Sequence, residues 1–487
     1  MTMDFLNAKN IHFVGLGGIG VSAIARYFAT QGAKVSGSDR SDFDGAKELR
    51  KRGIKVFIKH DAKNLPAKTE AIVYSSAVPY DNPELELART KGIPMFKYVE
   101  ALGEIMKGKY GIGVSGTNGK TTTTAMLGKI LEADKMDPMV IVGGKVPNWD
   151  ANLRLPNLPR SVLGKNGGLP IPRTDLGKEL FVVEACEYRR HFLKLAPKAI
   201  VLTNIEAEHL DYFKDIEDIK NAFSDYVGKL PKDGFLVYNA DDKNVVEVVK
   251  KTSARKISCS LKKKADAVAK NIRYEKGDQV FQVWWKGKDL GDFKIGVPGI
   301  FNVMNALEAL ACALVLGVNP ESAKKALAKF HGTWRRFERV GKAGKTIVIS
   351  DYAHHPAGVG ATIQAAKELY PGKKVLFVFQ PHQKDRTLKL MSEFAEVLQT
   401  ADDLILSEIY EVAGRNEAAK KVSSLDLISE ILKLRDTLRH AQGGSNIAYG
   451  ASLKETEKIV PKMLPYYHAI VIMGAGDIYQ IAETLIK

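Results

Sequence analysis

Short runs of aliphatic and β-branched residues alternate with helix-like patterns over the first hundred residues. Strands are predicted at 11–15, 34–38 and 71–74, and helices at 19–31 and 82–91. Single strands alternating with single helices are typical of a parallel sheet covered by helices on both faces. The first part of the chain is therefore predicted to be a doubly wound α/β domain.

A second α/β pattern begins near Tyr110, where the strand-like GIGVSG runs into a glycine-rich turn. A helix is predicted from 121 to 131, and further strands at 180–184 and 199–203. Residues 145–178 are rich in Pro, Gly and Asn and show no steady period. A long surface loop or insertion is expected there.

A third α/β pattern follows from about Phe330. Its predicted strands are 346–350, 375–379, 403–407, 447–449 and 469–473. We therefore expect three consecutive α/β domains, with boundaries at 1–107, 108–329 and 330–487.

Composition narrows the class of protein. The chain has 487 residues, 45% of them hydrophobic and 26% charged, which is typical of a folded globular protein. No apolar run reaches the roughly 18 to 20 residues of a membrane span, and the N-terminal stretch lacks a signal-peptide pattern, so a cytoplasmic protein without a membrane partner is expected. The three cysteines are far apart, and each is expected to be a free thiol serving as a small apolar side chain.

The net charge of +16 predicts anionic partners. The lysines are dispersed, and the densest run, 262–264, has no interleaved aromatic residues, so we interpret it as a solvated face and expect no nucleic-acid partner. A nucleotide together with a phosphate-rich small substrate would use the same positive field.

The strongest candidate for chemistry is the turn Gly116-Thr117-Asn118-Gly119-Lys120-Thr121, predicted between a strand and a helix. Backbone N–H groups of such a turn and of the helix N-terminus can hold phosphate oxygens. Lys120 can pair with the outer phosphates, and the Thr121 hydroxyl can bind Mg²⁺. Val114 stands where the strict phosphate-loop spacing has glycine, so an ordinary glycine-rich turn is the alternative.

Acidic residues and a histidine follow two later strands. Glu184 ends one predicted strand, and Glu206, Glu208 and His209 follow the next. The carboxyl ends of strands in an α/β sheet face the ligand crevice, where such side chains can hold Mg²⁺. A hydrogen-bonded structural role is the alternative for each.

The N-terminal turn Gly15-Leu16-Gly17-Gly18-Ile19-Gly20 fits GxGxxG, and Asp39 follows nineteen positions later. Glycines allow a diphosphate to approach, and the acid can reach a ribose. A UDP-sugar and a dinucleotide share these groups. An NAD dehydrogenase is one alternative, but that function would not explain the second glycine-rich turn at 116–121.

Three polar clusters border predicted strands of the last domain, at 334–338, 351–356 and 379–387. Arginine suits phosphoryl or carboxylate recognition, because its fork contacts two oxygens at once. For His354 and His355, a capped turn before Pro356 is the alternative.

Together these residues resemble the Mur ligases over nearly the whole chain. The motifs are GLGGIG (15–20), SSAVPYDNPE (75–84), GTNGKTTTT (116–124), TNIEAEHLDYF (203–213), PGIFNVMNAL (298–307), RRFE (335–338), DYAHHP (351–356) and FQPHQKDRT (379–387). The resemblance implies a Rossmann-like UDP-binding domain, a central phosphate-loop ATPase domain and a Rossmann-like C-terminal domain that presents the amino acid. It is nearest to the members that join L-alanine to UDP-N-acetylmuramate through an acyl phosphate, with ATP and Mg²⁺, in peptidoglycan precursor synthesis. A monomer or dimer is expected.

The resemblance also implies residue roles. Catalysis would rest on Lys120, Glu184, His209 and His355, and Mg²⁺ would be held by Thr121, Glu184 and His209. ATP would bind at Gly116, Thr117, Asn118, Gly119, Lys120, Thr121, Thr122, Asn302, Asn305, Arg335 and Asp351. The UDP-sugar would bind at Gly15, Gly17, Gly18, Gly20, Asp39, Ser75 and Ser76, and the amino acid at His355 and Arg386.

Four positions depart from the pattern of the alanine-adding members. They are Asn118 and Phe301, each in place of histidine, Cys186 in place of aspartate, and Gln383 in place of arginine. The pair Glu187-Tyr188 is similar to ligases that attach a recycled tripeptide to the same UDP-sugar. Tripeptide ligation, another amide ligase and a catalytically silent nucleotide-binding regulator therefore stay open as alternatives.

Overall fold

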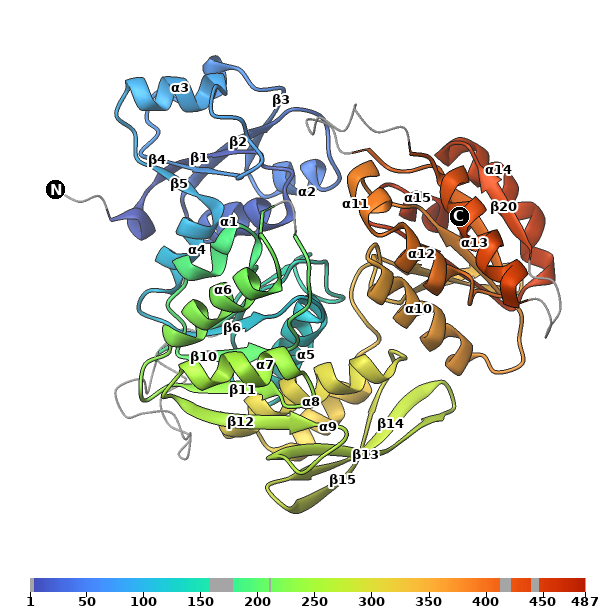
Figure 1. Ribbon diagram of the computed structural model, residues 1–487. Helices are drawn as coiled ribbons and strands as arrows, with labels where there is room; N and C mark the ends of the chain where they lie inside the picture. The colour runs from blue at the N-terminus through green and yellow to red at the C-terminus, as the bar shows by residue number, and fades with distance from the viewer. Residues whose placement is uncertain (1–3, 157–177, 210–211, 412–421, 439–445, 487) are drawn as a thin grey trace. The chain divides into compact units, whose positions relative to one another are not determined.

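The computed structural model describes residues 4–156, 178–209, 212–411, 422–438 and 446–486, and it contains three α/β domains (Figure 1). Of the predicted 145–178 insertion, residues 157–177 lie outside the described part. By contacts the chain divides into two compact units, and each is described by itself. The first comprises Met1–Lys270, Val283–Gly291 and Met304–Leu327, and the second Asn271–Gln282, Asp292–Val303 and Ala328–Lys487.

The N-terminal sheet has five strands in the order β3-β2-β1-β4-β5, all parallel, as predicted. The strands are β1 Asn10–Val14, β2 Lys34–Asp39, β3 Lys55–Ile58, β4 Ala71–Tyr74 and β5 Met95–Lys97. The helices are η1 Phe5–Asn7, α1 Ile19–Thr30, α2 Ala46–Lys51, η2 Ala62–Asn64, α3 Pro83–Thr90 and α4 Tyr98–Met106. The connections leave β1 and β4 in opposite directions along the sheet, so the crevice at their carboxyl ends is a topological switch point, where ligands bind in such folds.

The central sheet has ten strands in the order β15-β14-β13-β12-β11-β10-β6-β9-β7-β8. Its strands are β6 Tyr110–Ser115, β7 Met139–Ile141, β8 Leu153–Arg154, β9 Leu180–Glu184, β10 Ala199–Leu202, β11 Phe235–Asn239, β12 Arg255–Ser260, β13 Ala267–Glu275, β14 Asp278–Trp285 and β15 Lys288–Ile295. Its helices are α5 Lys120–Ala133, η5 Tyr188–Lys194, α6 Ile216–Gly228, α7 Lys243–Val248, η6 Val249–Lys251, α8 Ile300–Val315 and α9 Pro320–Ala328. The predicted strands β6, β9 and β10 and the helix α5 are confirmed.

Strands β13 to β15 were not predicted, and they add an antiparallel part to this sheet (Figure 1). Two-residue turns join them, which only antiparallel neighbours allow. Both turns are Lys-Gly pairs with two positive φ angles, 53° and 90° at Lys276-Gly277 and 49° and 81° at Lys286-Gly287. That combination is the type I′ hairpin turn, whose twist matches that of the strands.

The C-terminal sheet has six strands in the order β16-β17-β21-β18-β19-β20, and only β16 is antiparallel to its neighbour. The strands are β16 Glu338–Ala343, β17 Thr346–Asp351, β18 Val375–Phe379, β19 Asp403–Ser407, β20 Ile447–Gly450 and β21 Ala469–Met473. The helices are α10 Pro356–Leu369, α11 Lys384–Lys389, α12 Met391–Leu398, α13 Ser424–Leu438, α14 Leu453–Met463, η7 Leu464–Tyr466 and α15 Tyr479–Leu485. The five strands predicted for this region are confirmed.

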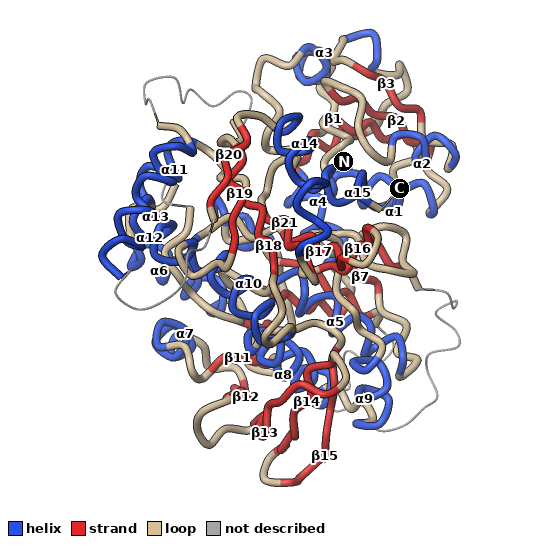
Figure 2. Tube along the Cα trace, turned by 90° about the vertical axis from the view of Figure 1, so that its right-hand side faces the viewer, coloured by secondary structure: helices blue, strands red, loops and turns tan. Residues whose placement is uncertain are grey.

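Alternate residues of the C-terminal strands enter two separate cores. Phe377 and Val471 pack with residues of α10, α12 and α13, whereas Val378 and Ile472 pack with residues of α14 and α15. In Figure 2, α12 and α13 lie on one side of β19 and β20, and α14 lies on the other. Because successive side chains of a strand point to opposite faces, this is the doubly wound arrangement expected from the alternating pattern.

All three cysteines are free thiols, as expected. Cys259 and Cys312 are buried, but Cys186 is exposed, so the expectation of an apolar packing role is wrong for Cys186. Among the described residues, no helix is both long enough and apolar enough to cross a membrane.

Candidate active site

The glycine-rich turn after β6 is built so that only glycine fits at two positions. Gly116 and Gly119 have φ angles of 135° and 84°, which L side chains rarely adopt. A Cβ atom on Gly116 would lie 2.1 Å from Oγ1 of Thr203, and one on Gly119 would lie 2.3 Å from Oδ1 of Asn305. The backbone can therefore wrap closely around the N-terminus of α5, the geometry that binds phosphate.

The loop that follows β10 holds this turn in place. Oγ1 of Thr203 donates to the carbonyl of Asn118 at 2.6 Å, and the amide of Asn118 donates to Oδ1 of Asn204 at 2.9 Å. The amide of Thr117 donates to the carbonyl of Asn204, and the amide of Glu206 to Oγ1 of Thr117, both at 2.9 Å. The turn is thus preorganised by its neighbour in the sheet.

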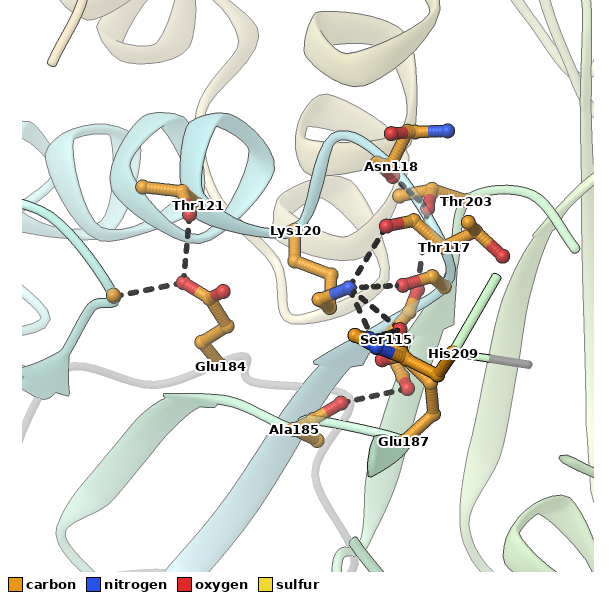
Figure 3. Close-up of polar contacts among 12 residues, drawn as sticks. Ser115, Thr117, Asn118, Lys120, Thr121, Glu184, Ala185, Glu187, Thr203 and His209 are labelled. Carbon is orange, nitrogen blue, oxygen red and sulfur yellow. Dashed lines mark hydrogen bonds and ion pairs between the residues drawn. The ribbon is translucent and has the colours of Figure 1, made fainter. Parts of the chain in front are cut away.

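Lys120, the first residue of α5, folds back over the turn (Figure 3). Its Nζ donates to the carbonyls of Gly116 at 2.6 Å and Thr117 at 2.9 Å, and it lies 3.0 Å from Oε2 of Glu187. Burial alone would lower the pKa of Lys120, but Glu187 and, more weakly, Glu208 and Glu184 outweigh it and raise the pKa. Lys120 therefore carries a full positive charge.

Glu184, at the end of β9, accepts two hydrogen bonds on the same carboxylate oxygen. Oγ1 of Thr121 donates to Oε2 at 2.9 Å, and the backbone amide of Gly143 donates to it at 2.7 Å (Figure 3). The hydroxyl of Thr121 and the carboxylate of Glu184 are thus brought together, as their predicted roles require.

His209 lies on the other side of Lys120. Its Nε2 is 3.5 Å from Oε1 of Glu187 (Figure 3). Its ring centroid is 4.7 Å from that of Tyr188. His209 has a φ of 57°, an unusual conformation for a residue with a side chain. One possible ligand atom from each of Glu187, Glu208 and His209 lies within 4.8 Å of the others.

These groups fit a magnesium site chemically. Hydroxyl and carboxylate oxygens are the donors that Mg²⁺ prefers, and an imidazole can complete such a set. The predicted metal residues divide into two places, Thr121 with Glu184 and His209 with Glu187 and Glu208. Lys120 stands between them.

Glu187 was not among the predicted site residues, whereas Glu208 was considered only as one of the acids after β10 that can hold Mg²⁺. Glu187 is only 2% exposed, and burial alone would raise its pKa. The positive charge of Lys120 and, after it, the contact with His209 outweigh burial and hold the pKa of Glu187 below its usual value. The sequence contained one indication of a role for Glu187, because it is a second acidic residue three positions after Glu184. Burial raises the pKa of Glu206, and Asp242 and Glu208 add to the effect.

The N-terminal glycine turn lies at the switch point between β1 and β4. The amide of Gly17 donates to Oδ2 of Asp39 at 2.8 Å, which joins the two halves of the predicted diphosphate and ribose site. A Cβ on Gly15 would lie 2.9 Å from Cβ of Ser75, and one on Gly20 would lie 2.4 Å from the ring of Tyr98. Ser76 follows Ser75 in the loop after β4, and the amide of Gly18 closes the turn on the carbonyl of Gly15 at 3.2 Å.

The remaining candidates in the central domain lie on α5 and α8. Thr122 is buried on α5, and Asn305 approaches Gly119. Asn302 donates from Nδ2 to the carbonyl of Pro298 at 2.6 Å, one turn earlier. Phe301, one of the departures from the family pattern, is exposed.

In the second unit, Arg335 and Asp351 are both buried and bonded to neighbouring loops. The guanidinium of Arg335 stacks on the rings of Tyr479 at 4.5 Å and Tyr352 at 4.9 Å, and it donates to the carbonyls of Gly474 and Gly476. Asp351 accepts hydrogen bonds from the amides of Phe337 at 2.6 Å and Ala353 at 2.7 Å. Burial raises the pKa of Asp351.

His355 is the N-cap residue of α10, with Pro356 at the first position of the helix. Nδ1 of the neighbouring His354 donates a hydrogen bond to the carbonyl of Tyr352 at 2.9 Å, and burial lowers the pKa of His354 well below the usual value, with Arg386 adding to the effect. Its ring lies 6.0 Å from that of His382.

His382 in turn stacks on Tyr410 at 5.5 Å. His354, His382 and Tyr410 thus gather where β17, β18 and β19 end, and the charge of Arg386, a predicted site residue, acts on His354.

Comparisons with known proteins agree with this architecture. The description "Mur ligase family, catalytic domain" matches residues 10–110, "Mur ligase middle domain" matches 114–313, and "Mur ligase, glutamate ligase domain" matches 335–476. The UDP-N-acetylmuramate–L-alanine ligase of Clostridium kluyveri is 37% identical over 100% of both chains, and that of Clostridium novyi is 38% identical over 100% of both chains.

Among solved structures, UDP-N-acetylmuramate-alanine ligase MurC from Thermotoga maritima is similar, with a TM-score of 0.78 and 27% identity over 99% of this chain and 98% of that one. A murein peptide ligase from Psychrobacter arcticus has the same fold, with a TM-score of 0.70 at 23% identity over 98% of both chains. Full-length identity and three consecutive domain matches lead to one conclusion: the chain belongs to the Mur ligase family of ATP-dependent, amide-bond-forming enzymes.

Proposed function

We propose that this enzyme joins L-alanine to the lactyl carboxylate of UDP-N-acetylmuramate, with hydrolysis of ATP to ADP and phosphate, in peptidoglycan precursor synthesis. The observation that carries the proposal is the charged Lys120 at the N-terminus of α5, set between Glu184 with Thr121 on one side and Glu187 with His209 on the other. The alanine-ligase relatives that match the whole chain supply the substrates.

The first step is transfer of the γ-phosphoryl group of ATP to the lactyl carboxylate, which gives an acyl phosphate. Phosphoryl transfer needs positioning and charge neutralisation rather than covalent participation by the protein. The amides of Thr117 and Asn118 already donate to Asn204, so the amides at the N-terminus of α5, from Gly119 onwards, would hold the phosphates. Lys120 would stabilise the negative charge that develops on the bridging oxygen. Bound Mg²⁺, held by Thr121 and Glu184 and by the Glu187, Glu208 and His209 group, would neutralise the remaining phosphate charge.

The acceptor acid would be presented by the N-terminal domain. Gly15, Gly17, Gly18 and Gly20 leave room for the diphosphate, Asp39 would accept from the ribose, and Ser75 with Ser76 would border the crevice. In this proposal the domains are 1–107 for the UDP-sugar, 108–329 for ATP and 330–487 for the amino acid. Because ATP and a UDP-sugar are its substrates, a cytoplasmic location follows.

The second step is attack of the amino group of L-alanine on the acyl phosphate, with departure of phosphate. Arg386 would pair with the carboxylate of the amino acid, and His355 would lie near its amine. In the same proposal Asn302 and Asn305 serve the adenine side, and Arg335 and Asp351 complete the nucleotide site. Exclusion of water protects the acyl phosphate, which otherwise hydrolyses.

A phosphate-release assay with UDP-N-acetylmuramate, Mg-ATP and one amine at a time tests the proposal. The amines are L-alanine, glycine, L-serine and the tripeptide L-alanyl-γ-D-glutamyl-meso-diaminopimelate, and the products are identified by mass. The expected result is phosphate release and a UDP-sugar product heavier by one alanine residue. A tripeptide adduct alone indicates a recycling ligase, and no release with any amine indicates a nucleotide-binding regulator.

A further inference from the structure

One buried side chain joins the N-terminal glycine turn to the segment that holds Glu184. Asn152 is 0% exposed, and its Nδ2 donates two hydrogen bonds, to the carbonyl of Ile19 at 3.0 Å and to the carbonyl of Val142 at 2.8 Å. Its Oδ1 accepts from the guanidinium of Arg26. Both polar atoms of the Asn152 side-chain amide are thus hydrogen-bonded, with two bonds to the N-terminal domain and one within the central domain.

The first bond fixes the start of α1. Ile19 is the first residue of that helix and follows directly on the Gly15–Gly18 turn. Asp150 adds two ion pairs to this clamp of residues 150–152, because it lies 3.7 Å from Arg26 on α1 and 3.0 Å from Arg52, the residue directly after α2. Residues 150–152 of the central domain therefore determine where the N-terminal helix, and with it the glycine turn, can sit.

The second bond reaches Glu184 in two steps. Val142 is held from both sides by Asn152, since its amide also donates to the carbonyl of Asn152 at 3.0 Å. The next residue, Gly143, donates to the Glu184 carboxylate at 2.7 Å, and a Cβ there would lie 2.5 Å from Oε2. Glu184 in turn holds the hydroxyl of Thr121.

Tyr98 packs against the start of helix α1. Its ring occupies the space that the missing side chain of Gly20 leaves, on the second residue of α1. Burial raises the pKa of the Tyr98 phenol, and the negative charge of Glu184 adds to the effect.

We infer that Asn152 is a positioning residue that couples the two substrate sites, so that a UDP-sugar seated on the glycine turn aligns Glu184 and Thr121 for the nucleotide. The inference rests on the proposed function, because it assigns the UDP-sugar to the glycine turn. A displacement of α1 moves the carbonyl of Ile19, and Asn152 passes that movement to Val142, Gly143 and Glu184. Since coupling is reciprocal, the nucleotide tightens UDP-sugar binding by the same factor.

Titration calorimetry of the full-length protein tests this with two probes, UDP-N-acetylmuramate and Mg-bound AMPPNP, each titrated with and without the other. Asn152→Asp keeps the shape and the acceptor for Arg26 but removes both amide donors. We expect the wild-type coupling factor, typically about 5- to 150-fold, to fall towards one in this variant. Arg52→Ala removes only one exposed contact of the clamp, and a smaller decrease is expected.

Asn10→Ala is the matched control, because among the described residues its side-chain amide donates to Glu70 at 3.3 Å, at the start of β1 and therefore at the opposite end of that strand from the glycine turn. Its coupling factor should equal that of the wild type. A purely structural role for Asn152 would lower the melting temperature and both affinities but leave their coupling unchanged, and that result overturns the inference.

Independent binding of the two probes by the wild type also overturns the inference. A wild type that binds neither probe overturns the proposed function itself. A folded Asn152→Asp protein is not essential, because Arg52→Ala and Asp150→Asn, which weakens the ion pairs to Arg26 and Arg52, measure the same coupling. An unchanged factor in both of these variants counts against the inference.

Discussion

The ammonium group of Lys120 lies 3.0 Å from a carboxylate oxygen of Glu187, and the two side chains are 13% and 3% exposed. Both pKa shifts agree with a charged pair, since Glu187 raises the pKa of Lys120 and Lys120 lowers that of Glu187 against the effect of burial. The pair aims the lysine along the glycine turn and links it to His209. The phosphate site and the acidic group beside it therefore form one electrostatic unit.

Replacing Lys120 with alanine should lower the ligation rate at least about a hundredfold, the scale for losing one preorganised charge contact in the transition state. The rate is measured as phosphate release at saturating ATP and UDP-N-acetylmuramate. Lys129→Ala is the control, because that lysine is on the same helix but, within the described part of the chain, pairs with Glu132 and Trp149. Near-normal ligation by Lys120→Ala would remove the assigned role.

Replacing Glu187 with glutamine should raise the Mg²⁺ concentration needed for half-maximal activity. The change keeps the size and a hydrogen-bond acceptor for Lys120, but it removes one of the charges grouped with Glu208 and His209. Carboxylates bind Mg²⁺ better than amides do, because the cation is hard and doubly charged. Activity is measured against Mg²⁺ at fixed ATP.

Glu132→Gln is the control for the magnesium titration. Glu132 lies near the C-terminal end of α5, where it accepts a hydrogen bond from Trp149 and pairs with Lys129. Its Mg²⁺ dependence should match that of the wild type. If the two variants respond alike, Glu187 acts only as a partner of Lys120.

Strand ends were predictable, but the order of the strands was not. The sheet order β10-β6-β9 brings the loops after β10 and β9 to either side of the Lys120 turn, and this places His209 and Glu187 beside one lysine. Each residue follows a run of buried aliphatic side chains that the pattern identifies. Which runs become neighbours depends on long-range packing, and therefore the pairing of His209 with Glu187 rather than Glu184 could not be foreseen.

Strands β13 to β15 escaped prediction for a local reason. Their residues are mostly polar or half-exposed, and their turns are Lys-Gly pairs rather than the more familiar Asn-Gly. Lysine at a positive φ is unfavourable alone, and the sheet on either side compensates for it. The prediction for Cys186 was wrong for a related reason. Its position directly after a buried strand suggested a packed side chain, but Cys186 lies in the loop after β9 and is exposed.

Replacing Arg386 with alanine should raise the KM for the amino acid far more than the KM for ATP, if its guanidinium pairs with the substrate carboxylate. Initial rates are measured while each substrate is varied at saturating levels of the others. Lys389→Ala, one turn further along α11, removes a neighbouring charge and should change neither constant much. Equal increases for both substrates in Arg386→Ala would exclude this arginine from the amino-acid site.

Replacing Glu308 with methionine should stabilise the protein at neutral pH. Glu308 lies on α8, three residues after Asn305, is 0% exposed, and neither carboxylate oxygen has a hydrogen-bond partner among the described residues. Burial raises its pKa well above the usual value, and Asp242 adds to the effect. Above about pH 4.3 the unfolded chain releases the Glu308 proton, whereas the folded protein keeps it. The free energy of unfolding therefore decreases as pH rises from that value towards the pKa of Glu308 in the folded state.

Methionine has a similar volume and no charge, so the variant should gain about 1–3 kcal/mol, the scale for relieving a buried, unpaired polar group. The gain should grow as pH rises, because the wild type loses stability and the variant does not. Melting temperatures of both proteins from pH 5 to pH 8 measure the effect, with Glu48→Met, whose side chain is 65% exposed, as the control for adding a methionine. Parallel pH profiles for Glu308→Met and the wild type would mean that Glu308 has an ordinary pKa, and the unpaired carboxyl group would then need another partner.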